Sequence, residues 1–190
     1  TGVYLEAGRH FARREYDRLA PKARKDFDPL RIAIGWAERN AAKKVVEISS
    51  TTEEGIREVI TRGLTPDPDT GYRMTTDEIA REIRARYGVD LGTTYGAREW
   101  NIARTELGFA MNYGHDQGAR AIESEYDLPM QKGWASSADD RVRDSHAALH
   151  GEYVPMDSTF SNGLEYPGDP SGPAEEVIAC RCVLVHRIIH

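Results

Sequence analysis

Cysteine is scarce in this sequence of 190 residues, which contains only Cys180 and Cys182. Two cysteines are too few for the disulfide framework of a small secreted domain, and a bridge between positions two apart would need strained geometry. We therefore expect a protein of a reducing compartment. A chain of this length can bury a hydrophobic core without covalent cross-links.

Long hydrophobic runs are also missing. A membrane-spanning helix needs roughly 20 consecutive apolar residues, whereas the longest apolar runs here, such as 183–185 and 188–189, fit within a strand. The composition, with 39% hydrophobic and 29% charged residues, is that of an ordinary globular protein. The sequence predicts a folded protein with no membrane partner.

An excess of positive charge is absent as well, because 25 Lys and Arg stand against 31 Asp and Glu, a net charge of -6. The first 50 residues are the exception, with 11 basic against 7 acidic residues, which leaves 14 against 24 in the remainder. The candidate contacts to nucleic acid or to a partner are therefore Arg13, Arg14, Lys43 and Lys44. Acidic residues interleave this segment, which favours a solvated helix surface over a nucleic-acid interface.

Several catalytic signatures are missing. The sequence has no glycine-rich phosphate-binding loop. In the helix of a zinc peptidase, a glutamate directly follows the first histidine, whereas here Ala147 follows His146. Asp144, Ser145 and His146 have the residue types of a hydrolase triad, yet neighbours on a helix point about 100° apart. A cysteine nucleophile, Cys180 or Cys182, would have to pair with His186 on the same strand, whereas a nucleophile and its base normally come from separate elements. The residues thus predict a protein that is not an enzyme.

Apolar residues recur every three to five positions through most of the first 127 residues, a spacing typical of amphipathic helices. We expect helices over about 4–19, 30–48, 51–63, 75–87 and 95–119. Two hydroxyl–carboxylate pairs have the spacing of a capping box, Thr51 with Glu54 and Thr75 with Glu78. This part of the chain, residues 1–127, is predicted to be a helical arm or bundle.

The pattern changes at Pro129. The residues from Met130 to Trp134 favour an extended strand. Residues 142–150 favour a short helix that is closed by Gly151, with cap signals at Ser136 and Ser137. The alternating apolar run 178–189 favours a second strand. We expect an α+β fold, in which a small C-terminal unit of residues 128–190 carries a few antiparallel strands. This C-terminal unit would pack on the long helix at 95–119.

Four residues could form a metal site in the C-terminal unit. His146 and His150 are four apart and would share one face of a helix, and Cys180 and Cys182 would share one face of the last strand. Together they offer the ligands of a structural zinc site. The alternative is two imidazoles that interact with carbonyls at a helix end and two cysteines that fill the core. No other cofactor is indicated.

Charged residues gather at two further places. Arg104 and Glu106 lie in the middle of the long helix. A second set near Trp134 comprises Asp139, Arg141, Arg143 and Asp144. The set could form a helix cap with a salt-bridge network. We favour a polar cluster that docks the C-terminal unit onto the long helix through Arg104 and Glu106.

The order of short motifs from about residue 95 to 185 resembles the phage head morphogenesis family, the minor head proteins similar to the F protein of phage Mu. The residues that carry the resemblance are Ala103-Arg-Thr-Glu106, Lys132-Gly-Trp134, the run from Asp139 to Gly151, Phe160, Tyr166-Pro-Gly-Asp-Pro170 and Cys180-Arg-Cys182. Each motif is short, but their order and spacing together are specific. They cover about half of the chain, and they also mark Arg181 as a motif residue.

Many relatives carry a Cys-x-x-Cys and a histidine before Cys-Arg-Cys, a set that looks like a zinc site. The corresponding positions here are Arg143, His146 and Val177, so His146, Cys180 and Cys182 remain as potential ligands. A salt bridge of Arg143 would replace part of the metal's role. His150 falls on a position that is often acidic in relatives.

The resemblance implies a structural role without catalysis. The chain would be a low-copy head component of a tailed phage that contacts the portal protein or the major capsid protein and acts in head assembly and in DNA packaging or delivery. It would be made in the bacterial cytoplasm and lie inside the virion head, near the portal and the packaged DNA. Two other functions remain as alternatives. One is a metal-dependent, nuclease-like effector that uses His146, His150 and nearby acids, and the other is a nucleic-acid-binding module.

Overall fold

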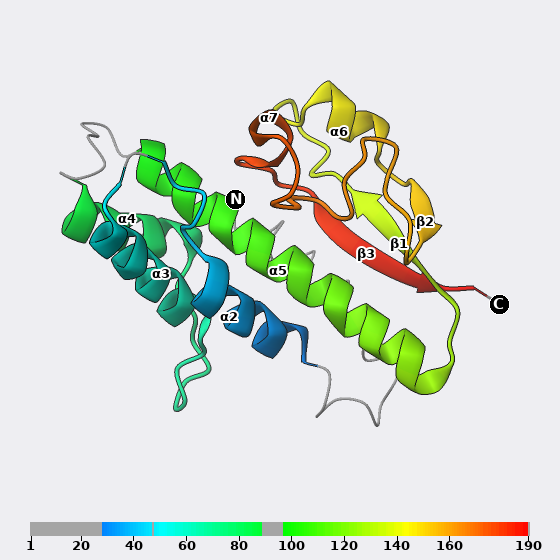
Figure 1. Ribbon diagram of the computed structural model, residues 1–190, viewed down its shortest axis with the longest axis horizontal. Helices are drawn as coiled ribbons and strands as arrows, with labels where there is room; N and C mark the ends of the chain where they lie inside the picture. Colours follow the sequence, from blue (N-terminus) through cyan, green and yellow to red (C-terminus); the bar gives the residue numbers. More distant parts are fainter. Residues whose placement is uncertain (1–27, 47, 89–96, 190) are drawn as a thin grey trace.

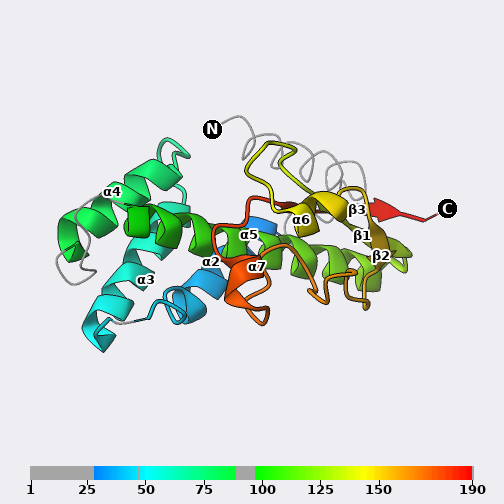
Figure 2. The same ribbon diagram turned by 90° about the horizontal axis from the view of Figure 1, so that it is seen from above.

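The computed structural model of the protein describes residues 28–46, 48–88 and 97–189. One long helix, α5 (Ala97–Tyr126), crosses the middle of the molecule, with α2, α3 and α4 on one side and a small sheet on the other (Figure 1). Seen from above, α3 and α4 lie toward one end of α5 and the sheet lies toward its other end (Figure 2). This arrangement confirms the α+β fold. None of the helices described has the length and apolarity to span a membrane.

The described elements follow the predicted order of helices before strands. Their bounds are α2 Pro29–Asn40, α3 Ser50–Leu64, α4 Thr76–Tyr87, α5 Ala97–Tyr126, β1 Met130–Ala135, α6 Asp144–Ala148, β2 Tyr153–Pro155, α7 Ala174–Val177 and β3 Val183–Ile188. The predicted first helix, at 4–19, lies outside the described residues. The division into units at residue 127 stays a prediction.

Local chemistry sets the starts of the helices. Thr75 and Glu78 form the predicted capping box at α4. The predicted capping pair of Thr51 and Glu54 is wrong, because α3 begins two residues earlier, where the side chain of Ser49 accepts a hydrogen bond from the backbone N–H of Thr52. Ser49 and Thr51 both carry a hydroxyl group that could cap the helix. The earlier start adds half a turn and buries Thr52.

The second helix is shorter than its apolar pattern predicts. It ends at Asn40 instead of near residue 48, and Ala42 then adopts a left-handed φ of 65°. The Nε atom of Arg57, on α3, donates to the backbone oxygen of Ala41. A side chain of α3 therefore gives the Ala41 carbonyl a hydrogen bond at the point where the chain leaves α2.

The long helix has buried residues all around it because it packs against other elements on opposite sides. One hydrophobic core runs from α2 through α5 to the sheet. The ring of Phe109 lies edge-on to Trp36 of α2 at 6.2 Å, while Tyr113 lies edge-on to Tyr166 of the C-terminal unit at 6.4 Å. The helix extends to Tyr126, beyond the predicted end at residue 119.

The three strands form an antiparallel sheet in the order β2-β1-β3. The last strand begins only at Val183, although the alternating pattern predicts it from residue 178. The reason is that Ala179 adopts a left-handed φ of 55°, which turns the chain before the ladder begins. Cys180 and Cys182 consequently lie in a bend ahead of the strand.

A single buried amide fixes the sheet on the long helix. The Nδ2 atom of Asn112 donates to the backbone oxygens of Pro167 at 2.7 Å and Cys182 at 3.2 Å. Its Oδ1 atom accepts from the backbone N–H of Leu184 at 3.0 Å. Backbone groups on two loops and a strand therefore depend on one side chain for their hydrogen bonds.

Two glycines of α5 should respond in opposite ways to substitution by alanine. A Cβ atom at Gly114 would lie 2.3 Å from the backbone oxygen of Pro29, whereas at Gly108 the nearest atom outside its own helix would be 3.8 Å away. We expect Gly114→Ala to lower the free energy of unfolding by about 1–3 kcal/mol, and Gly108→Ala to raise it by up to about 1 kcal/mol through helix propensity. Urea titration of both variants measures this, and equal effects would contradict the packing.

Candidate metal centre

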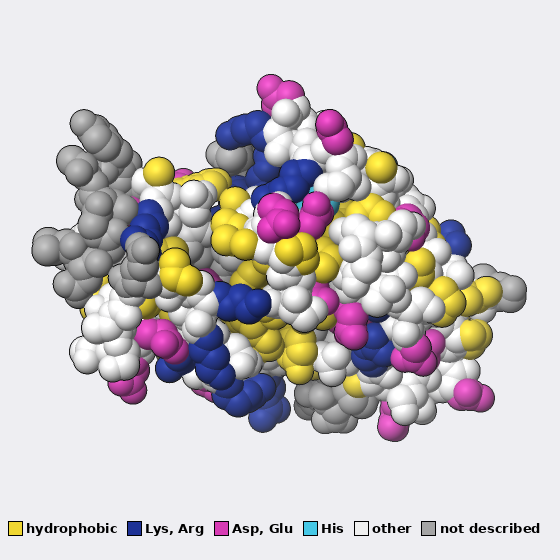
Figure 3. Space-filling model, turned by 45° about the horizontal axis from the view of Figure 1, so that its top comes forward, with side chains coloured by type: hydrophobic (Ala, Val, Ile, Leu, Met, Phe, Trp, Pro, Cys, Tyr) yellow, Lys and Arg dark blue, Asp and Glu magenta, His cyan; other side chains and the backbone are white. Residues whose placement is uncertain are grey.

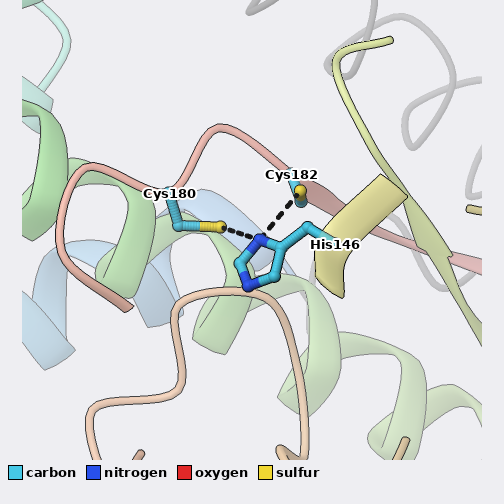
Figure 4. Close-up of side chains that lie close together, drawn as sticks. All are labelled: His146, Cys180 and Cys182. Atoms are coloured by element: carbon cyan, nitrogen blue, oxygen red, sulfur yellow. Dashed lines mark hydrogen bonds between the residues drawn. The ribbon is translucent and has the colours of Figure 1, made fainter. Parts of the chain in front are cut away.

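Three side chains of the C-terminal unit converge on one point. The Nδ1 atom of His146 lies 3.6 Å from the Sγ atom of Cys180 and 3.5 Å from that of Cys182 (Figure 4). All three residues are buried, with exposed fractions of 1%, 8% and 5%. One ligand atom from each lies within 4.8 Å of the others, and among the described residues they form a group that could hold a metal ion.

Two elements bring these side chains together. His146 lies on α6, where its ring is held edge-on against Trp134 of β1 at a centroid distance of 5.0 Å. The bend that carries the cysteines is fixed by the backbone N–H of Ala179, which donates to the Thr105 Oγ1 atom of α5 at 2.9 Å. The two cysteines thus face the same imidazole, although not from one face of a strand as predicted.

The other nitrogen of His146 faces a carboxylate. Its Nε2 atom lies 2.8 Å from the Oε2 atom of Glu176 on α7. An ionised carboxylate favours a proton on Nε2, so in the neutral imidazole the lone pair of Nδ1 is the one directed at the two sulfur atoms. The sequence prediction missed Glu176, because only tertiary structure brings α7 to α6. The available signal was that Glu176 directly precedes Val177, the position to which the family resemblance assigns a histidine.

The charges of the cluster are coupled. Hydrogen bonds from Cys182 and His146 lower the pKa of the Cys180 thiol to about 5, in spite of its burial. A hydrogen bond with Cys180 and burial raise the pKa of Cys182. Burial alone would lower the pKa of His146, but Cys180 and Glu176 raise it above its ordinary value. The site therefore stabilises thiolate at one sulfur, the form that binds metals.

The set of Cys180, His146 and Glu176 also has the order of a nucleophile, a base and a carboxylate that orients it. Such a relay needs a nucleophile that a substrate can reach. Both Cys180 and His146 are buried, and two sulfur atoms compete for one nitrogen. The geometry suits the binding of an ion better than turnover of a substrate.

The fourth predicted ligand, His150, is not part of the cluster. The helix α6 ends at Ala148, so His146 and His150 do not share a helix face as the spacing of four predicted. The Nδ1 atom of His150 instead accepts a hydrogen bond from the backbone N–H of Ser136 at 3.1 Å. His150 is exposed and outside the cluster, which corrects the prediction of a site with two cysteines and two histidines.

The predicted charged set forms contacts around the cluster. Asp139 pairs with the guanidinium group of Arg181 and accepts from the backbone N–H of Arg141. The Nη2 atom of Arg143 donates to the backbone oxygen of Ile178 at 2.6 Å. These bonds tie the segment before α6 to the bend that carries the cysteines. They also correct the predicted caps, since Arg143 is the N-cap residue of α6.

The remaining motif residues of this segment have separate places. Asp144 is exposed in the first turn of α6. Gly151 has a left-handed φ of 83°, and its N–H donates to the backbone oxygen of Trp134 at 2.9 Å. A residue with a side chain would be strained there, so Gly151 closes the turn between α6 and β2.

The two residues of the predicted docking pair, Arg104 and Glu106, lie on different sides of α5. Arg104 lies over the ring of Trp100 at 4.4 Å. Burial lowers the Arg104 pKa, as do the positive charges of Arg181 and Arg141, which places it beside the charged set. Glu106 faces the connection between α2 and α3, where it accepts a hydrogen bond from the backbone of Ala42. Glu106 also lines a pocket together with Val177 and Ile178 of the C-terminal unit, so its docking role stays a prediction.

The predicted basic contacts are only partly described. Arg13 and Arg14 lie outside the described residues. The Nζ atom of Lys43 donates to Asn40 at 3.1 Å, and that of Lys44 donates to the backbone oxygen of Pro170. Lys44 therefore joins the helical side to the C-terminal unit.

The stability of the protein should depend on pH through Glu106. Burial raises its pKa from 4.5 to about 7. Between these values the folded protein holds a proton that the unfolded chain releases, so the free energy of unfolding falls as the pH rises. We expect Glu106→Gln to gain up to about 3 kcal/mol relative to wild type between pH 5 and pH 8.

Urea titrations at the two pH values measure this difference. The matched control is Glu54→Gln, at an exposed position of α3, which should keep the wild-type pH dependence. A Glu106→Gln variant with the wild-type dependence would show that this carboxyl is ionised throughout the range.

Comparison with known proteins places most of the chain in a family. The model of a family described as Phage Mu protein F like protein matches residues 54–185, which is more than half of the chain. This range begins within α3, ends within β3 and includes the metal-ligand candidates. No curated protein and no solved structure matches the chain.

Proposed function

The chain belongs to the family of phage Mu protein F like proteins, and on this premise we propose that it is a structural minor head protein of a tailed phage. It would act in head assembly and in DNA packaging or delivery, in contact with the portal protein or the inner capsid surface. Its place would be inside the virion head, after synthesis in the bacterial cytoplasm. The match over residues 54–185 carries this proposal, because the family points to phage head morphogenesis.

The buried site supports a role without catalysis. His146, Cys180 and Cys182 are enclosed, and the exposed His150 binds its own chain. A nuclease-like enzyme would need a metal ion that a phosphate can approach. The alternative of nucleic-acid binding is disfavoured by the balance of 14 basic against 24 acidic residues after residue 50. A protein partner fits this charge better than DNA.

An apolar pocket of about 230 Å³ supports a protein contact. It lies between α5, the α2–α3 connection and α7, and Val46 and Ile178 in its lining are 69% and 46% exposed. Hydrophobic side chains gather in the middle of the face drawn in Figure 3, with charged side chains among them. Large exposed apolar residues that line one pocket are typical of interaction surfaces. We assign this pocket to contact with a head component.

Quantitative mass spectrometry of purified particles tests the proposed function. We expect the chain in virions at a copy number equal to or below that of the portal subunits, because a minor head protein is a low-copy component. The control is the same measurement on the unassembled cell fraction. Absence from particles, with the protein free in the cell, would refute the structural role.

The pocket is tested by charged substitutions at its rim. We expect Val46→Asp or Ile178→Asp to reduce incorporation into heads at least tenfold, since a buried unpaired carboxylate costs several kcal/mol at an interface. Both sites are exposed in the isolated chain, so folding should be retained, which circular dichroism checks. Tyr72→Asp, another exposed position at 52%, is the control and should be incorporated normally. Normal incorporation of both rim variants would place the contact elsewhere.

A further inference from the structure

The distances in the buried cluster fit a metal ion. Zinc binds imidazole nitrogen at about 2.0 Å and thiolate sulfur at about 2.3 Å, so tetrahedral angles place those two ligand atoms about 3.5 Å apart. The two Nδ1–Sγ distances at His146 are 3.6 Å and 3.5 Å. An ion between the three atoms therefore needs little movement of the side chains.

Hydrogen bonds alone account for the arrangement less well. The Nδ1 atom of a neutral imidazole has one lone pair and accepts one good hydrogen bond. Two sulfur atoms nevertheless lie at nearly equal distances from it. Equal distances from one nitrogen are expected where a shared ion holds both cysteines.

Glu176 completes the arrangement from the other side of the ring. Histidines that bind metals commonly donate their second N–H to a carboxylate, which fixes the tautomer and the orientation of the ring. The 2.8 Å contact between Nε2 and Glu176 has this form, and Trp134 packs against the same ring. Glu176 itself is on the far side of the imidazole from the sulfur atoms.

We propose that His146 Nδ1 and the Sγ atoms of Cys180 and Cys182 bind one zinc ion, and that Glu176 is a positioning residue which directs Nδ1 toward the metal. Two thiolates and one imidazole form a soft ligand set that suits zinc and excludes magnesium and calcium. The described residues supply three ligands, so water or another group takes the fourth position. The proposal is independent of whether the protein lies in a phage head.

The ion would be structural. It would join α6 to the bend before β3, two segments of the C-terminal unit that otherwise meet through the Arg143–Ile178 hydrogen bond and the Asp139–Arg181 pair. Binding to the folded state alone raises the free energy of unfolding by mass action. Removal of zinc by a chelator should therefore lower the melting temperature of the full chain, and stoichiometric zinc should restore it.

Metal titration of the chelator-treated 190-residue chain is the direct test. We expect one Co²⁺ per chain, with the near-ultraviolet charge-transfer band of thiolate ligation, and displacement of Co²⁺ by one equivalent of Zn²⁺. Cys182→Ser should lose most of the band while retaining the fold by circular dichroism. A wild-type chain that shows no thiolate–cobalt band, or a Cys182→Ser variant that keeps it fully, would overturn the proposal.

The role of Glu176 has its own matched pair of variants. Glu176→Gln should weaken zinc affinity about 10- to 100-fold, as is usual for the loss of a partner of a metal-binding histidine. Glu175→Gln, at the exposed neighbouring position, should bind zinc like the wild type. Competition with a chromophoric chelator measures both affinities. Equal zinc affinities of the two variants would reject Glu176 as a positioning residue even where zinc is bound. If Glu176→Gln is too unstable to measure, Glu176→Asp replaces it, and we expect this variant to weaken zinc binding as well.

Discussion

The hydrogen bonds that α5 makes to the backbone before β3 hold the C-terminal unit in place. Thr105 accepts from Ala179, and Asn112 binds both Cys182 and Leu184. The two side chains are seven residues apart, two turns of a helix, so they share a face. Between their contacts lies the short bend with both cysteines. The rigid helix thus sets the spacing at which the sulfur atoms meet His146.

The Arg104-Thr105-Glu106 motif shows how one helix serves several segments. Arg104 lies beside the charged set of the C-terminal unit, Thr105 holds the bend at Ala179, and Glu106 accepts from Ala42 in the connection between α2 and α3. Ala179 and Ala42 both have left-handed backbones. A non-glycine residue in that conformation needs support from its surroundings. Adjacent residues of α5 supply that support on two different sides of the helix.

Burial decides what the cysteine–histidine cluster can do. Its residue types would allow nucleophilic chemistry at an open site, but enclosure by Trp134 and α7 leaves the ligand atoms facing one another. This property agrees with the structural role that we propose for the chain. Two exposed apolar side chains, Val46 and Ile178, lie instead at the pocket beside α7, so stability and the proposed partner contact are assigned to different places.

The sequence by itself determined the elements whose causes are local. Helical periodicity, the capping box of Thr75 and Glu78, the strand that contains Trp134 and the α+β order were all predicted from neighbouring residues. Tertiary structure alone decided the rest. It ended α2 at Asn40, delayed β3 to Val183, excluded His150 from the cluster and brought Glu176 to His146. The physical reason is that these outcomes depend on hydrogen bonds between residues far apart in the chain, which local spacing does not encode.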